Sequence, residues 1–74
     1  MGLFTKRQKG QGTVLDKTDM YGVWFEMIVE MDSGARERVK LSRKDESMIA
    51  AGDTISLNYQ PGKKNGKAKD VKRL

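Results

Sequence analysis

The chain has 74 residues and a formal net charge of +5, with 15 Lys and Arg, 10 Asp and Glu, and neither Cys nor His. This length corresponds to one small domain, and the lack of Cys and His excludes disulfides, thiolate or imidazole metal ligands, a cysteine nucleophile and a histidine base. The carboxylates that remain are scattered singly among Lys and Arg, so we expect a non-enzymatic protein without metal or cofactor. No apolar run approaches the roughly 20 residues that span a bilayer, so we expect no membrane span and a cytoplasmic location.

Positive charge is concentrated toward the two ends of the sequence. Residues 1–12 carry three positive charges and no negative one, residues 13–59 carry six positive and nine negative, and residues 60–74 carry six positive and one negative. A polyanion would therefore meet the ends of the chain. Residues 1–11 lack apolar alternation and are predicted to form a flexible basic arm, followed by a single small β-barrel domain over residues 12–74.

The first predicted strand covers residues 12–18 and ends in a loop that contains Tyr21. The second covers residues 23–31, where every odd-numbered position is apolar and is expected to face the core. Its outer face carries Trp24 and Ile28 beside two glutamates. The alternation therefore predicts one buried face, which includes the first residue of the run, and one mixed face toward solvent.

A third strand is predicted for residues 35–41, after a three-residue hairpin loop that ends in Gly34. Inward residues are odd-numbered on both strands, so two residues that lie opposite each other must both be odd-numbered or both even-numbered. The length of the three-residue loop then determines which residues are opposed. The outer pairs would be Glu30 with Arg36, Ile28 with Arg38, and Glu26 with Lys40. The row of three cations is either a phosphate-tracking site or a row that the two glutamates neutralise, and the direct opposition favours neutralisation.

A short helical turn is predicted between the third and fourth strands. Ser42 and Asp45 have the spacing of a capping box, and Gly52 is a typical stop. Met48 and Ile49, near the end of this segment, are expected to close one end of the barrel.

The fourth predicted strand covers residues 53–60, with Ile55, Leu57 and Tyr59 facing inward. In the fifth, Ala68 and Val71 cannot share a face without a bulge, so its pairing is expected to be irregular. Five short strands with a helical turn after the third form the order of an OB-like barrel in an all-β protein. An SH3-like barrel is the alternative architecture.

Three segments carry a resemblance to a known family: Gly12-Thr13-Val14, residues 21–28, and the ending from Ala51 to Leu74. They resemble the small OB-fold nucleic-acid-binding domains of the cold-shock and S1-like type. The resemblance implies a barrel that stacks bases on aromatic side chains of its second and third strands. Here the third strand has no aromatic residue, which leaves Trp24 and Tyr21 as the stacking candidates.

We therefore predict nucleic-acid binding with low sequence specificity, to single strands in preference to duplex, mainly through the basic C-terminal hairpin. The predicted contact residues are Lys63, Lys64, Lys67, Lys69, Lys72 and Arg73 of that hairpin, with Trp24, Tyr21 and Arg38. The competing interpretation of the hairpin lysines is a solvated strand edge, and that of Trp24 is packing beneath Leu3 and Phe4 of the arm. The alternative function is a protein-interaction or structural module, monomeric or weakly homodimeric, that uses Trp24 and Ile28 as an apolar patch.

Overall fold

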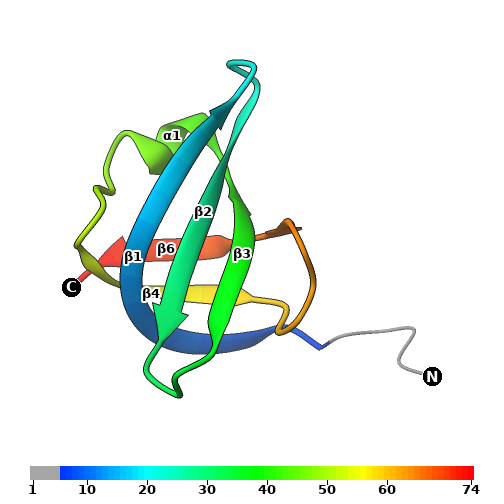
Figure 1. The fold of residues 1–74 in the computed structure, drawn as a ribbon, viewed down its shortest axis with the longest axis vertical. Coiled ribbons are helices and arrows are strands. Elements are labelled where there is room, and N and C mark those ends of the chain that lie inside the picture. The colour runs from blue at the N-terminus through cyan, green and yellow to red at the C-terminus, as the bar shows by residue number, and fades with distance from the viewer. Residues whose placement is uncertain (1–5) are drawn as a thin grey trace.

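The structure, a computed structural model, describes residues 6–74. Over this range, one curled sheet forms a half-barrel with a single short helix at its rim (Figure 1). The elements are β1 (Gln8–Met20), β2 (Trp24–Met31), β3 (Arg36–Leu41), α1 (Arg43–Glu46), β4 (Thr54–Tyr59), β5 (Gly66–Lys67) and β6 (Lys69–Arg73). The predicted all-β class and the helical turn between the third and fourth strands are confirmed, whereas the described part of the chain has six strands instead of five.

The sheet order is β5-β3-β2-β1-β4-β6, with β5 parallel to β3 and every other pair antiparallel. The two strands at opposite ends of this order are separated in sequence by Ala68 alone. The Ala68 side chain is buried and its N–H donates to the Lys40 carbonyl at 2.9 Å. Asp70 then has φ 52°, and the β4–β6 register shifts between Ser56 and Asn58. The predicted irregularity is therefore confirmed, and it divides the expected fifth strand in two.

The predicted arm was too long, because its last residues belong to β1. Gln8 pairs with Tyr59, and the pairing with β4 continues along β1. A Cβ on Gly10 would lie 2.9 Å from the Met31 Cε atom, and one on Gly12 would lie 2.5 Å from a backbone carbonyl of β2. Glycines thus occupy the inward positions where neighbouring chain packs closely, and this is why no apolar alternation marks this part of the strand.

The register of β2 against β3 is confirmed at each of the three predicted outer pairs, and it places Phe25 opposite Leu41 and Met27 opposite Val39 on the inner face. Gly34 has φ 95° at the end of the hairpin loop, a conformation that favours glycine. The loop length and the odd numbering of the inward residues therefore specify the same alignment of β2 with β3. The outer faces of both strands are fixed by the same register.

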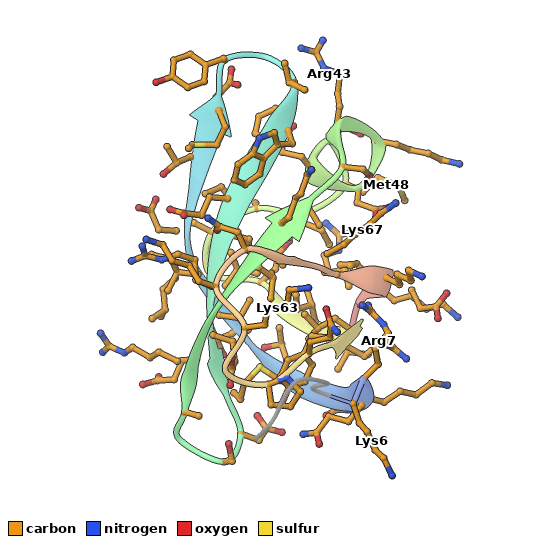
Figure 2. The ribbon with its side chains drawn as sticks, turned by 90° about the vertical axis from the view of Figure 1, so that its right-hand side faces the viewer. Lys6, Arg7, Arg43, Met48, Lys63 and Lys67 are labelled. Atoms are coloured by element: carbon orange, nitrogen blue, oxygen red, sulfur yellow. The ribbon has the colours of Figure 1, made fainter. Side chains whose placement is uncertain are left out.

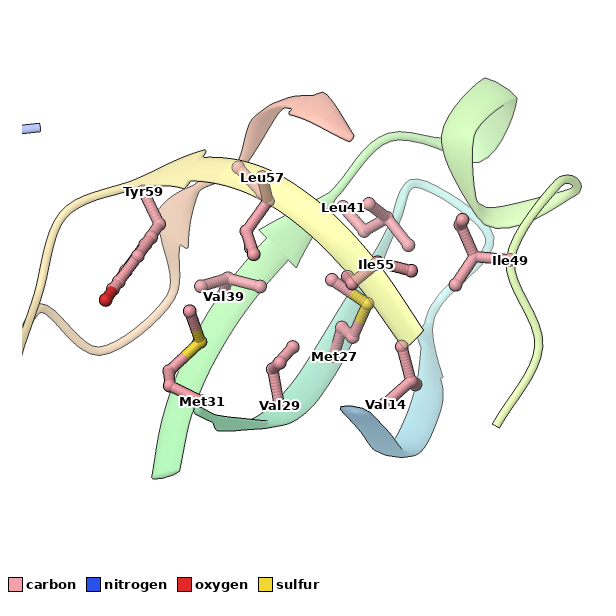
Figure 3. Close-up of a cluster of buried hydrophobic side chains, with 11 residues drawn as sticks. Val14, Met27, Val29, Met31, Val39, Leu41, Ile49, Ile55, Leu57 and Tyr59 are labelled. Atoms are coloured by element: carbon pink, nitrogen blue, oxygen red, sulfur yellow. The ribbon is translucent and has the colours of Figure 1, made fainter. Parts of the chain in front are cut away.

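The core lies inside the curl of the sheet (Figure 3). Its buried residues are Val14, Met27, Val29, Met31, Val39, Leu41, Ile49, Ile55, Leu57, Tyr59 and Ala68. The predicted inward positions of β3 and β4 are confirmed. In β2 the prediction was wrong for Val23, which is 75% exposed because it lies in the turn before the strand, where its N–H donates to the Met20 carbonyl.

Helix α1 is a single turn at one end of the half-barrel. The Ser42 hydroxyl accepts a hydrogen bond from the Asp45 N–H at 3.2 Å, which confirms the N-cap. Ile49 is buried as predicted, whereas Met48 is 65% exposed and does not close the barrel. Lys17 of β1 instead connects the sheet to this segment, because its ammonium donates to the Glu46 carboxylate at 2.8 Å and to the Ile49 carbonyl.

Candidate nucleic-acid interface

A cluster of cations lies along β3, β5 and the loop between β4 and β5. Lys40 and Lys67 are register partners on these two strands, and the loop approaches β3 where the Asn65 N–H donates to the Arg38 carbonyl at 2.9 Å. We call the cluster the β3–β5 basic face. It consists of Arg38, Lys40, Lys63, Lys64 and Lys67, all of them exposed. The structure thus joins half of the predicted hairpin residues to Arg38.

The loop that carries Lys63 and Lys64 is held in place by a hydrogen bond to Glu37 of β3. Gly62, at φ 76°, donates its N–H to the Glu37 carboxylate at 2.9 Å, and Asn65 has φ 59°. The Lys63 N–H donates to the Gln60 carbonyl at 3.2 Å. Glu37 therefore orders a loop that presents two lysines, although the sequence offered no signal for this long-range contact.

Arg7, the residue before β1, reaches the same face. Its guanidinium donates to the Asn58 side chain at 2.6 Å, to the Asn58 carbonyl at 2.8 Å and to the Lys67 carbonyl at 2.7 Å. Figure 2 shows Lys6 and Arg7 on the side of the molecule that also presents Lys63 and Lys67. Sequence reasoning placed Arg7 in a flexible arm and missed this role, because its partners lie far away in the sequence.

The outer row of β3 is neutralised only in part. Arg36 pairs with Glu30 at 3.8 Å, as expected, but Glu26 pairs with Arg38 at 3.7 Å instead of with Lys40. Lys40 lies over the Trp24 ring, with its ammonium 5.2 Å from the ring centroid. The predicted opposition of Glu26 and Lys40 is confirmed in the register, but the ion pair expected from it is replaced, because Glu26 pairs diagonally with Arg38 while Lys40 packs on the indole. No ion pair within residues 6–74 involves Lys40 or a lysine of the loop or β5.

The two aromatic candidates occupy different positions. Trp24 is half-buried at the start of β2, beside Met20 and beneath Lys40, so it borders the basic face. Tyr21 is 94% exposed at the tip of the β1–β2 turn, which Arg43 holds by donating to the Gly22 carbonyl at 2.8 Å. The expected cover of Trp24 by Leu3 and Phe4 lies outside the described residues. Trp24 is thus the aromatic residue placed next to the cations.

The remaining predicted cations lie around the curl of the sheet, on β6 beside β4. They are Lys69, Lys72 and Arg73, and all three are exposed. Lys72 is the register partner of Ser56 and lines a groove of about 320 Å³ on the β4 side, together with Lys9 and Asp70. The structure therefore divides the predicted hairpin between two faces and does not bring its six cations together.

The apolar patch considered for a protein partner is interrupted. On the outer face of β2, Glu26 lies between Trp24 and Ile28. Its carboxylate forms an ion pair with Arg38, so a charged group separates the two apolar side chains. Ile28 is half-buried. An interaction surface centred on Trp24 and Ile28 stays a prediction.

Comparisons of the chain with protein-family models, with curated proteins and with solved structures found no significant match. No helix in the described part of the chain is long and apolar enough to cross a bilayer. The site itself offers lysine ammonium groups, backbone held in fixed turns, and one indole ring with a cation above it. These groups are suited to phosphates and to flat π-systems.

Proposed function

We propose that this protein is a non-enzymatic OB-like barrel that binds nucleic acid through the β3–β5 basic face, with low sequence specificity and a preference for single strands. The main support for the proposal is that Lys40 and Lys67 lie opposite each other on adjacent strands, and that Lys40 lies over the Trp24 ring. Cations from two strands and a partly exposed indole thereby share one surface, and this combination favours a phosphate backbone with accessible base faces.

The strand pairing supports the OB-like part of the proposal. If β5 and β6 are counted as one strand interrupted at Ala68, that strand pairs with β3 at its start and with β4 at its end. Five strands then follow one another around a partly open barrel. The basic face uses the outer side of β2 and β3 and the loop before the last strand, which is where OB-folds bind oligonucleotides.

The proposed contacts predict how binding depends on salt. Lys40, Lys63, Lys64 and Lys67 would each neutralise one phosphate, and each such contact contributes a slope of about −0.7 in the logarithmic salt dependence for single strands, or about −3 in total. A base would displace Lys40 from the Trp24 ring and stack there, with a contribution of about 1–3 kcal/mol. Duplex hides its base faces, so it would lack the stacking contribution.

A titration of Trp24 fluorescence with a short oligothymidylate tests the proposal, since Trp24 is the only Trp in the chain. We expect saturable quenching that becomes about 50-fold weaker in affinity between 50 and 200 mM salt, and weaker binding of a duplex of equal charge. The double variant Lys40→Gln, Lys67→Gln should lose affinity and reduce the salt slope by about 1.4.

The matched control is Lys9→Gln, Lys72→Gln, which removes the same charge from the β4 side of the sheet. Its affinity for the oligonucleotide should stay close to that of the unmodified protein. Equal losses in the two double variants would show that net charge alone drives binding, and no binding at low salt would refute the function itself.

A further inference from the structure

The curled sheet is left open along one side of β6. This strand is the last in the sheet order and pairs with β4 only, over Asn58 to Ile55. The pairing of β5 with β3 ends at Lys67 and Lys40, so β6, which begins at Lys69, is not paired with β3. In Figure 1, β6 lies between β4 and the region of α1. Within residues 6–74, no strand pairs with the edge of β6 that faces away from β4.

An apolar pocket adjoins this open edge. It has a volume of about 380 Å³ and is lined by Met48, Ile49, Val71, Lys72 and Arg73. Met48 is 65% exposed, and Leu74 after β6 is 63% exposed. Exposed apolar side chains beside an unpaired strand edge are typical of a surface that another chain covers. Met is well suited to such a surface because its side chain adapts to its partner.

The charge of β6 indicates which kind of chain could pair with its open edge. The strand contains three cations and one carboxylate, and none of the ion pairs described in residues 6–74 involves it. Two copies of this edge would bring net positive charge against net positive charge, which opposes self-pairing. An extended segment rich in Asp and Glu would instead be attracted to the same side chains.

We propose that β6 accepts an acidic, extended peptide segment of a partner protein as an added strand. The backbone of this segment would pair with the open edge, one aliphatic side chain would enter the pocket at Met48, Ile49 and Val71, and carboxylates on the opposite face of the added strand would meet Lys72. In this binding mode the main chain supplies affinity, and pockets for alternate side chains supply specificity. The site shares no residue with the β3–β5 basic face and does not depend on the proposed function.

A fluorescein-labelled seven-residue peptide, Asp-Val-Glu-Leu-Asp-Val-Glu, is a direct probe when its anisotropy is measured. We expect saturable binding that weakens at least about fivefold when the central Leu becomes Ser, as the loss of one buried aliphatic side chain requires. N-methylation of alternate backbone amides, which blocks strand pairing without changing charge, should weaken binding to a similar degree. A peptide with Lys in place of the acids should not bind.

Protein variants separate this site from general electrostatics. Lys72→Glu with Arg73→Glu should abolish binding, and Met48→Ser should weaken it at least about fivefold. Lys63→Glu with Lys64→Glu makes the same charge change on the other face and should leave the affinity within about twofold. All these side chains are exposed, so each variant is expected to fold.

Several outcomes would overturn the proposal. Equal losses in the two charge-reversed variants would mean nonspecific attraction, and full affinity of the N-methylated peptide would exclude strand addition. Displacement of the peptide by saturating oligothymidylate would place it on the β3–β5 basic face. No binding at all would show that the lysines of β6 only keep the edge solvated.

Discussion

Arg7 is a single residue that contacts two strands of the half-barrel, β4 and β5. Its guanidinium makes three hydrogen bonds that connect the residue just before β1 to Asn58 of β4 and to Lys67 of β5. We predict that Arg7→Ala lowers the free energy of unfolding by about 1–3 kcal/mol, since hydrogen bonds from a charged donor contribute this much when partly buried. Arg7→Lys should restore only part of it, because an ammonium cannot reproduce the planar fork.

Urea unfolding followed by Trp24 fluorescence measures both variants of Arg7. Lys6→Ala is the control, because the Lys6 side chain is exposed and its removal should change stability by less than about 0.5 kcal/mol. A stability of Arg7→Ala equal to that of the control would contradict the proposed role.

Gly10 and Gly12 offer a graded test of close packing in β1. A Cβ at Gly12 would lie 2.5 Å from the Glu30 carbonyl oxygen, whereas one at Gly10 would meet the flexible end of Met31 at 2.9 Å. We predict that Gly12→Ala destabilises the protein by more than about 3 kcal/mol and Gly10→Ala by about 1 kcal/mol. Thermal unfolding of the two variants should preserve this order, and a reversed order would refute the packing argument.

At the scale of elements, the β2–β3 hairpin holds both a confirmed register and a partly masked row of cations. Glu26 pairs with Arg38 on the basic face. We predict that Glu26→Gln raises oligonucleotide affinity and makes the salt slope steeper by about 0.7, because Arg38 becomes free to meet one more phosphate. The ion pair is partly exposed, so stability should change by less than about 1 kcal/mol.

Asp32→Asn is the matched control for that change, since it removes one negative charge from the exposed β2–β3 loop at a distance from Arg38 along the strand. Its salt slope should equal that of the unmodified protein. An equal gain in affinity for both variants would attribute the effect to net charge.

The elements that sequence reasoning predicted correctly are those with local signals. The β2–β3 register followed from parity and a glycine-ended loop, and the cap at Ser42 followed from its spacing to Asp45. The start of β1 was missed because Gly10 and Gly12 replace the apolar residues that mark an inward face. Five of the predicted core positions in β3 and β4, in contrast, had a regular alternation to reveal them.

The candidate site was harder to predict because its geometry comes from contacts between distant residues. The basic hairpin reads as one continuous run, but the buried Ala68 and the positive φ of Asp70 turn its second half toward β4. Lys40 lies over Trp24 while Arg38, not Lys40, forms the ion pair with Glu26. Neither effect has a local sequence signature.

At the scale of the whole molecule, the contact between β3 and β5 is the weakest part of the sheet. It consists of two register pairs, compared with eight between β1 and β2. We predict that the amides of Asn65 and Ala68, which donate to β3, exchange with solvent much faster than those of Val29 and its neighbours in β2. Hydrogen exchange followed by NMR measures both.

If an oligonucleotide binds the basic face as proposed, it would bridge β3 and β5, so it should slow the exchange of Asn65 and Ala68 and leave the β1–β2 amides unchanged. Uniform protection throughout the sheet would indicate only global stabilisation. Exchange at Asn65 and Ala68 as slow as in β2 before any ligand is added would contradict the assignment of a weak contact.

The Arg7 contacts also have a consequence for how the chain reaches this fold. Arg7 and Asn58 lie 51 positions apart in the sequence, and Arg7 and Lys67 lie 60 apart. Pairings of such separation incur loop-closure entropy before they return any stabilisation. The β1–β2–β3 meander can form early from local turns. The contacts of Arg7 with Asn58 and Lys67, in contrast, form only when β4 and β5 reach the start of β1. The rate of refolding should therefore be limited by this late encounter, and stabilising the local hairpins alone should not accelerate it.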